Sequence, residues 1–506
     1  TAQTAPPPSI TTVIRRVEGG VEIAFETPVE SREARLYWTD RASSQSLAGP
    51  FPAYDRVVTL SGRGNFHRTV LPVASDAGGA GPESPVEPLP LGRVIHIRAA
   101  CTIDAGDRAR ELGSADRTLR LIAGPDGAPQ LALVFTEEPA VAQVGAEMAV
   151  LRWETNDPAR TLLQYWREDK PETKWSLRNE QPLRLVQTSL AGLESNRAYC
   201  FTVSSRSEDE RDAIQAPPGT FRTAPDGYEV FRFAVMGNSA GDPSRGDPDM
   251  DVAGVNVKTL HRMAAAAARR GARFILFTGD AITSRAPAAL VAGRRYAAWR
   301  QALRPVRAGI PVYGTIGNGE ATSPHRRVND EVPGMLFAED VWRGEQTLPP
   351  NGPPPRVNQP PYLENVYSFD FAHCHFVSLN SNYRQLRGAD PASPQFHTID
   401  PRQQEWLEAD LAANDEKMTF VFFSEPAWPT GGAPGGALDR VESNRNRVWQ
   451  ILDKSGATAI FSGYLGHYSR LGVDERIRPE ATRRLWQVVC GRAGGPGAWD
   501  AHGGGP

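Results

Sequence analysis

At 506 residues the chain is too long for one compact core and, at about 100–200 residues per domain, predicts roughly three domains. Its composition of 40% hydrophobic and 23% charged residues, with a formal net charge of -3, is that of a soluble globular protein and predicts no nucleic-acid or anionic-membrane partner. The longest apolar runs have only the length of strands, so the sequence also predicts no membrane span.

The first part of the chain consists of short segments of strand type separated by clusters of Gly, Pro, Asp and Ser. These segments are 21–27, 34–40, 56–62, 66–73, 93–103 and 118–124. Short strands at such spacing are typical of a β-sandwich. We therefore assign a first domain, an N-terminal β-sandwich, to residues 1–125.

A second series of strand-type segments predicts a second β-sandwich over residues 126–225. The segments are 131–137, 147–156, 161–168, 174–179, 183–190, 197–205 and 219–225. Within them, LAGLESNRAYCFTV resembles the signature of fibronectin type III domains, in which a leucine lies six positions before a tyrosine whose hydroxyl fastens a loop, here Leu193 and Tyr199. Alternation places Cys200 on the opposite face of its strand from Tyr199 and Phe201, which predicts a free thiol or an intermolecular bridge.

In the third part, residues 226–506, strands alternate with helices, which predicts an α/β domain. Apolar segments at 231–237 and 273–280 have the length of buried strands, and the periodic segment 255–271 between them predicts a helix that ends at Gly271.

The cysteines and the first residues of the chain indicate whether the protein is exported from the cell. The four cysteines, Cys101, Cys200, Cys374 and Cys490, show no paired spacing, so the sequence predicts neither a zinc ribbon nor a dense disulfide framework. The chain begins at Thr1 in a small, polar run, as does a chain that has lost a signal peptide. We expect an exported protein, secreted or at the cell surface.

Five motifs at the predicted strand ends carry the functional signal of the third part: VMGNSAGD, FTGDAI, TIGNGE, FFSEPAW and FSGYLGHYSR. Their order and spacing resemble those of the calcineurin-like metallophosphoesterase superfamily. With two sandwiches in front, the chain resembles a purple acid phosphatase that carries fibronectin type III-like domains. The resemblance implies an αββα sandwich with two metal ions at the strand ends.

The first three motifs depart from the family pattern G-D-x-H, G-D-x-x and G-N-H-[DE]. Asn238 and Ala240 stand where the family has aspartate and histidine in the first motif. Asp280 keeps the bridging aspartate of the second motif. In the third, Asn318 is kept, but Gly319 replaces a histidine that acts on the leaving group or the phosphate.

The last two motifs have lost their histidines. Glu425 replaces the single histidine of the fourth motif, and Tyr464 and Gly466 replace the two histidines of the fifth. His467 is one position away, and on a strand or tight turn one position turns a side chain elsewhere.

The remaining donors do not match a pair of transition metals, because two such ions held about 3.5–4 Å apart need several carboxylate and imidazole ligands. We therefore expect no cofactor, or one weakly bound Ca²⁺ or Mg²⁺, because oxygen donors suit hard cations. The oxygen donors of that hypothetical single-cation site are Asp280, Asn318, Glu425 and Tyr464. The alternative is that these are ordinary pocket residues that bond to one another and to water.

Three functions stay open at this point. The first is a pseudoenzyme whose degenerate metal site belongs to a binding or structural module with an unknown protein or surface ligand as partner. The second is a divergent phosphomonoesterase or phosphodiesterase that uses a single ion. The third is a subunit of an extracellular assembly, in which residues 1–8 add to a neighbour's sheet edge.

Two further expectations concern geometry. If the motif alignment is right, the residues of the five motifs converge at one rim of the third domain. His373 and His375 are two positions apart on a predicted strand, where packing or a surface position is a better interpretation than metal chelation.

Overall fold

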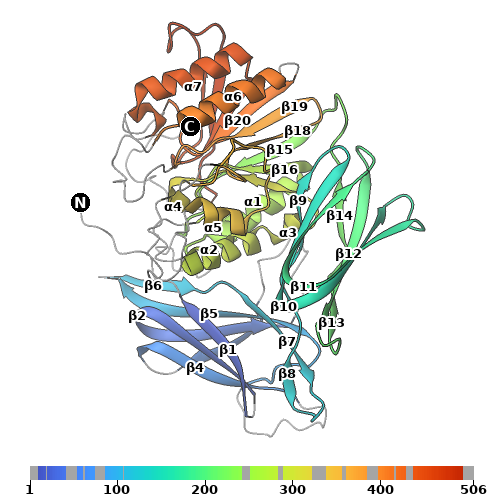
Figure 1. Cartoon of the computed structure of the whole chain (residues 1–506). Helices are drawn as coiled ribbons and strands as arrows, with labels where there is room; N and C mark the ends of the chain where they lie inside the picture. The colour runs from blue at the N-terminus through green and yellow to red at the C-terminus, as the bar shows by residue number, and fades with distance from the viewer. Residues whose placement is uncertain are drawn as a thin grey trace.

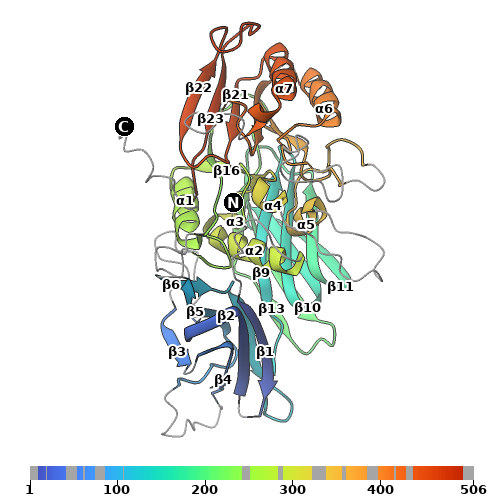
Figure 2. The same ribbon diagram turned by 90° about the vertical axis from the view of Figure 1, so that its left-hand side faces the viewer.

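A computed structural model gives the architecture (Figures 1 and 2). The structure describes residues 10–18, 20–40, 54–60, 63–74, 86–105, 108–241, 251–282, 289–321, 338–355, 360–383, 397–414, 417–428 and 437–493. No helix in these ranges is long and apolar enough to span a membrane.

The first part of the chain forms one eight-stranded sheet. Its strands are β1 (Thr11–Val17), β2 (Gly20–Thr39), β3 (Arg56–Leu60), β4 (Gly64–Pro72), β5 (Val94–Ala105), β6 (Arg108–Gly113), β7 (Arg117–Ala123) and β8 (Pro129–Leu131). The long strand β2 pairs antiparallel with β1, β3, β4 and β5. Inward-facing residues such as Phe25, Leu36 and Trp38 are buried in one core, as alternation along a half-buried strand predicts.

The second part forms a six-stranded antiparallel sheet. Its strands are β9 (Phe135–Val144), β10 (Met148–Arg167), β11 (Lys174–Ala191), β12 (Ala198–Ser207), β13 (Ala213–Gln215) and β14 (Gly219–Arg222). The hydroxyl oxygen of Tyr199 accepts a hydrogen bond from the Glu194 N–H at 2.9 Å, so the tyrosine fastens the loop as predicted. Tyr199 and Phe201 are buried, while Cys200 is half-buried and its thiol is free, which confirms the strand-face assignment.

The third part contains two sheets. The first has the parallel order β15 (Arg232–Met236), β16 (Ala272–Phe277) and β17 (Val312–Gly314). The second has the order β18 (Tyr367–Phe371), β19 (Cys374–Ser378), β20 (Met418–Phe423), β21 (Ala459–Ser462), β23 (Leu485–Val489) and β22 (Ser469–Val473). The described strands of the first sheet are all parallel, because a crossover rather than a hairpin joins each pair, whereas the second sheet is mixed.

Helices accompany both sheets of the third part. They are α1 (Val257–Arg269), α2 (Ala289–Ala302), α3 (Arg304–Arg307), α4 (Asn318–Ala321), α5 (Ala338–Glu345), α6 (Pro401–Ala413) and α7 (Glu442–Ser455), with a 3-10 turn at Leu438–Arg440. Helix α1 packs on the first sheet, and α6 and α7 pack together on the second (Figure 1). Aromatic rings fill the space between the two sheets. Phe233 stacks on Phe274 of the same sheet, with ring centroids 5.3 Å apart, and meets Phe376 of the second sheet edge-on.

Buried polar contacts hold the three parts together. Glu137 of β9 lies among arginines of α2 and α3, and the side-chain amide of Gln301 exchanges two 3.0 Å hydrogen bonds with the backbone of Asp116. Figure 2 shows β9 and β10 beside the helices of the third part, with the first sheet below. The loop between β15 and α1 also touches the first sheet, because Val252 forms an isolated bridge with Gly113 of β6.

Candidate functional site

The five strand ends meet at one rim through their backbones. The Asn238 N–H donates to the Gly279 carbonyl at 2.9 Å, which joins the ends of β15 and β16. The Gly463 N–H donates to the Ser424 carbonyl at 2.9 Å, which joins the ends of β20 and β21. A Cβ added at Gly279 would lie 2.8 Å from the Cα of Gly317 and 3.0 Å from the Cβ of Ser424, so the ends of β16, β17 and β20 are close together here.

Asp280 lies at the centre of this rim. It is 5% exposed, and its Oδ1 accepts a 2.7 Å hydrogen bond from the Gly319 N–H. Burial raises the pKa of Asp280 to about 6. Burial, together with the charges of Glu425 and Asp280, raises the pKa of Tyr464 to about 12. The structure thus brings Asp280, Gly319, Glu425 and Tyr464 together.

The other candidate positions lie on the same loops. Asn238 lies two residues after the end of β15, and its buried Oδ1 has no hydrogen-bond partner among the described residues. Asn318 is the first residue of α4. Ala240, at the position of the first-motif histidine, pairs with Val255 in an isolated bridge ahead of α1. The backbone at this position therefore lies beside the backbone of Val255.

Three of these residues have left-handed backbone conformations. The φ angles are 54° at Asn238, 55° at Asp280 and 63° at Tyr464. For residues other than glycine this conformation costs about 1 kcal/mol or more each, and such residues cluster at functional sites. The loops at the strand ends therefore hold three of the candidate residues in strained backbone conformations.

Glu425 is held by a residue that the motifs do not include. The carboxylate is fully buried, and both of its oxygens lie 2.8 Å from Nδ1 of His397. Burial raises the pKa of Glu425, and the contact with His397 opposes that effect. No signal in the sequence pointed to His397, which lies 28 positions before Glu425.

Glu320 is a second residue that the sequence interpretation missed. Its side chain accepts hydrogen bonds from the N–H groups of Gly317 at 2.8 Å and of Asp280 and Ile282 at 3.1 Å, so it fastens the ends of β16 and β17 together. Burial and the neighbouring Asp280 raise the pKa of Glu320 to about 8. It occupies the acidic fourth position of G-N-H-[DE], so the motif itself held the signal.

The space of two missing histidines is filled. A Cβ at Gly319 would overlap the backbone carbonyl oxygen of Ile282, which cannot move without its loop. A Cβ at Gly466 would overlap the guanidinium of Arg492. A side chain at Gly319 would therefore have to displace backbone, whereas one at Gly466 would have to displace the end of the Arg492 side chain.

The donors at this rim do not fit a dinuclear metal centre. Of the altered motif positions, Glu425 alone carries a carboxylate, and a histidine Cβ at Gly319 would overlap the backbone carbonyl oxygen of Ile282. Across the part of the chain that the structure describes, no group of three His, Cys, Asp or Glu residues could hold a metal. Bound transition metals need several such ligands together.

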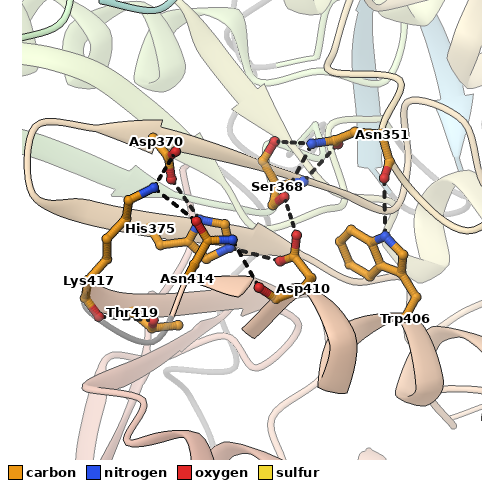
Figure 3. Close-up of polar contacts among 9 residues, drawn as sticks. All are labelled: Asn351, Ser368, Asp370, His375, Trp406, Asp410, Asn414, Lys417 and Thr419. Carbon is orange, nitrogen blue, oxygen red and sulfur yellow. Dashed lines mark hydrogen bonds and ion pairs between the residues drawn. The ribbon is translucent and has the colours of Figure 1, made fainter. Parts of the chain in front are cut away.

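His373 and His375 are not part of the rim. Nδ1 of His375 lies 2.7 Å from Asp370, and its Nε2 lies 2.8 Å from Asp410 of α6 (Figure 3). Ser368 donates to the same Asp410 at 2.9 Å, and Lys417 reaches Asp370. His373 instead stacks on Tyr228. The two histidines do not act as a chelating pair, and packing is the right interpretation.

Solved structures show which fold this is. The chain is similar to PhoD, with a TM-score of 0.50 and 14% identity over 71% of this chain and 77% of that one. No protein-family model and no curated protein matches the sequence. The two stacked sheets and the rim of strand-end loops are therefore those of the calcineurin-like metallophosphoesterase fold, as the motifs predicted.

A second similarity covers nearly the whole chain. Purple acid phosphatase PPD1 from seeds of yellow lupin (Lupinus luteus) matches with a TM-score of 0.55 and 11% identity, over 96% of this chain and 86% of that one. At this identity the likeness concerns the fold alone.

Proposed function

We propose that the protein is a pseudoenzyme: an exported, metallophosphoesterase-fold protein that serves as a binding or structural module and has no dinuclear metal centre. In this proposal the two N-terminal β-rich parts are β-sandwich modules in front of an αββα domain, and the partner is a protein or surface ligand. A weakly held Ca²⁺ or Mg²⁺ is the only ion expected.

The observation that supports the proposal most directly is the closure of the rim. Two dications and a phosphate are stable together only when several anionic and imidazole ligands surround them. Here a backbone carbonyl lies against Gly319 and a guanidinium lies against Gly466. Gly319 also lacks any side chain that could protonate a leaving group.

Elemental analysis and phosphate-ester turnover test this proposal. The purified full chain should contain no stoichiometric iron, zinc or manganese, and its hydrolysis of p-nitrophenyl phosphate should equal that of Asp280→Ala. A full equivalent of a transition metal would overturn the proposal, as would turnover that disappears in Asp280→Ala. That outcome would support the divergent phosphoesterase instead.

A further inference from the structure

Two side chains from outside the motifs reach into the rim where the fold's metal ligands belong. His397 places Nδ1 at 2.8 Å from both oxygens of Glu425. Arg492 places its guanidinium in the space that a side chain at Gly466 would take. Glu425 and Gly466 both stand at positions where the family has histidine.

The backbone around each side chain is fixed. Two residues after His397, Ile399 exchanges hydrogen bonds of 3.0 and 2.7 Å with the side-chain amide of Asn444 on α7. On either side of Arg492, the Cys490 N–H donates to Ser462 and the Ala493 N–H donates to Gly237, both at 2.7 Å. The backbone beside His397 is therefore anchored to α7, and the backbone on both sides of Arg492 is anchored to the ends of β21 and β15.

The chemistry of these donors explains how the rim is stable without metal. A buried carboxylate such as Glu425 is costly unless a cation or hydrogen-bond donor satisfies it. The imidazole N–H of His397, which points to both oxygens, meets that need at Glu425. The guanidinium of Arg492 places a permanent positive charge beside Gly466. A divalent cation at Glu425 would have to displace the His397 hydrogen bond.

We propose that His397 and Arg492 are internal substitutes for the metal ions of this fold, so that cation binding at Glu425 and the His397 contact exclude each other. This inference rests on the proposed function and deepens it. It predicts that removing the imidazole opens an oxygen-lined site at Glu425 and Asp280. Oxygen donors favour calcium or magnesium there.

The test is calcium chloride titration of the full-length protein, by calorimetry and by thermal unfolding at pH 8. His397→Ala should bind calcium at least tenfold more tightly than wild type, and calcium should raise its Tm. His397→Gln should behave as wild type, because its amide N–H can still donate to Glu425. Adding Glu425→Ala to His397→Ala should abolish the gain. Equal affinity of wild type and His397→Ala, or a gain that survives Glu425→Ala, would overturn the inference.

If His397→Ala does not fold even with calcium, Arg492→Gln carries the test. Arg492→Gln should bind calcium more tightly than wild type, and adding Asp280→Asn should remove that gain. If Arg492→Gln binds calcium no more tightly than wild type, the inference is overturned. The two proposals fail differently. Transition metal or turnover in wild type overturns the pseudoenzyme, whereas a metal-free wild type with no gain in either variant overturns only the substitution by His397 and Arg492.

Discussion

Single residues of the rim differ in how far the sequence could predict them. Because the motifs are in register, the replacements at Glu425, Gly319 and Gly466 could be named directly. The residues that occupy the emptied space could not be named from the sequence, because His397 and Arg492 lie outside every motif and reach the rim only through tertiary packing. A motif can show that a ligand has gone, but only the packing shows whether its place is still open.

Gly319 gives the test at this scale. Gly319→Ala should lower the free energy of unfolding by about 1–3 kcal/mol, because the added methyl overlaps the carbonyl oxygen of Ile282 in a packed site. Urea unfolding measures the change. Gly344→Ala is the matched control, since Gly344 lies in helix α5 with no atom within 4 Å of an added Cβ. That control should be neutral or slightly stabilising, and equal effects of the two variants would contradict the closure of the rim.

Among the elements, the long strands were the least predictable from the sequence. The segments 21–27 and 34–40 were interpreted as two strands, but both belong to β2, and likewise 147–156 and 161–168 both belong to β10. In each strand a proline lies where the pairing register shifts, between Glu26 and Ser31 and between Glu154 and Ala159. Proline and turn formers normally end a strand, whereas a β-bulge lets the strand continue past them.

Strand β9 is joined to α2 and α3 by a buried ion cluster that can be tested. Glu137 lies 2.6 Å from Arg307, 3.3 Å from Arg300 and 3.4 Å from Arg152. Glu137→Ala should lower the free energy of unfolding at pH 7 by about 3–5 kcal/mol, because it leaves buried guanidinium groups without their anion. Chemical denaturation at fixed pH measures this loss.

The neighbouring Glu138 provides the control for that variant. It pairs with Arg304 at 2.9 Å but is 39% exposed, so Glu138→Ala should cost about 1 kcal/mol or less. Although burial opposes it, the arginines lower the pKa of Glu137 to about 2. The contribution of Glu137 is therefore present above its unfolded pKa of about 4.5 and is lost as the pH falls toward 2. Similar losses for the two variants would contradict the role of the cluster.

At the scale of the whole molecule, the sequence could predict two β-rich parts ahead of an α/β part, because the change from period 2 to alternating helices and strands is local. It could not predict how the parts join. The junction depends on contacts such as that between Asp116 and Gln301, which are 185 positions apart in the sequence. No periodicity or motif records a contact of that kind.

His96 of β5 makes this junction sensitive to acid. It is 5% exposed, and burial, followed by the positive charge of Arg304, lowers its pKa to about 4. The unfolded chain therefore binds a proton near pH 6.5 that the folded chain binds only near pH 4, so His96 makes stability fall as the pH drops through that window. A shift of this size corresponds to about 3 kcal/mol. Urea unfolding between pH 7 and pH 4 should show wild type losing about that much more than His96→Gln. His373→Gln removes an imidazole away from the junction, so its free energy of unfolding should change with pH as that of wild type does. If the free energies of unfolding of wild type and His96→Gln differ by the same amount at every pH, His96 is not held neutral at the junction.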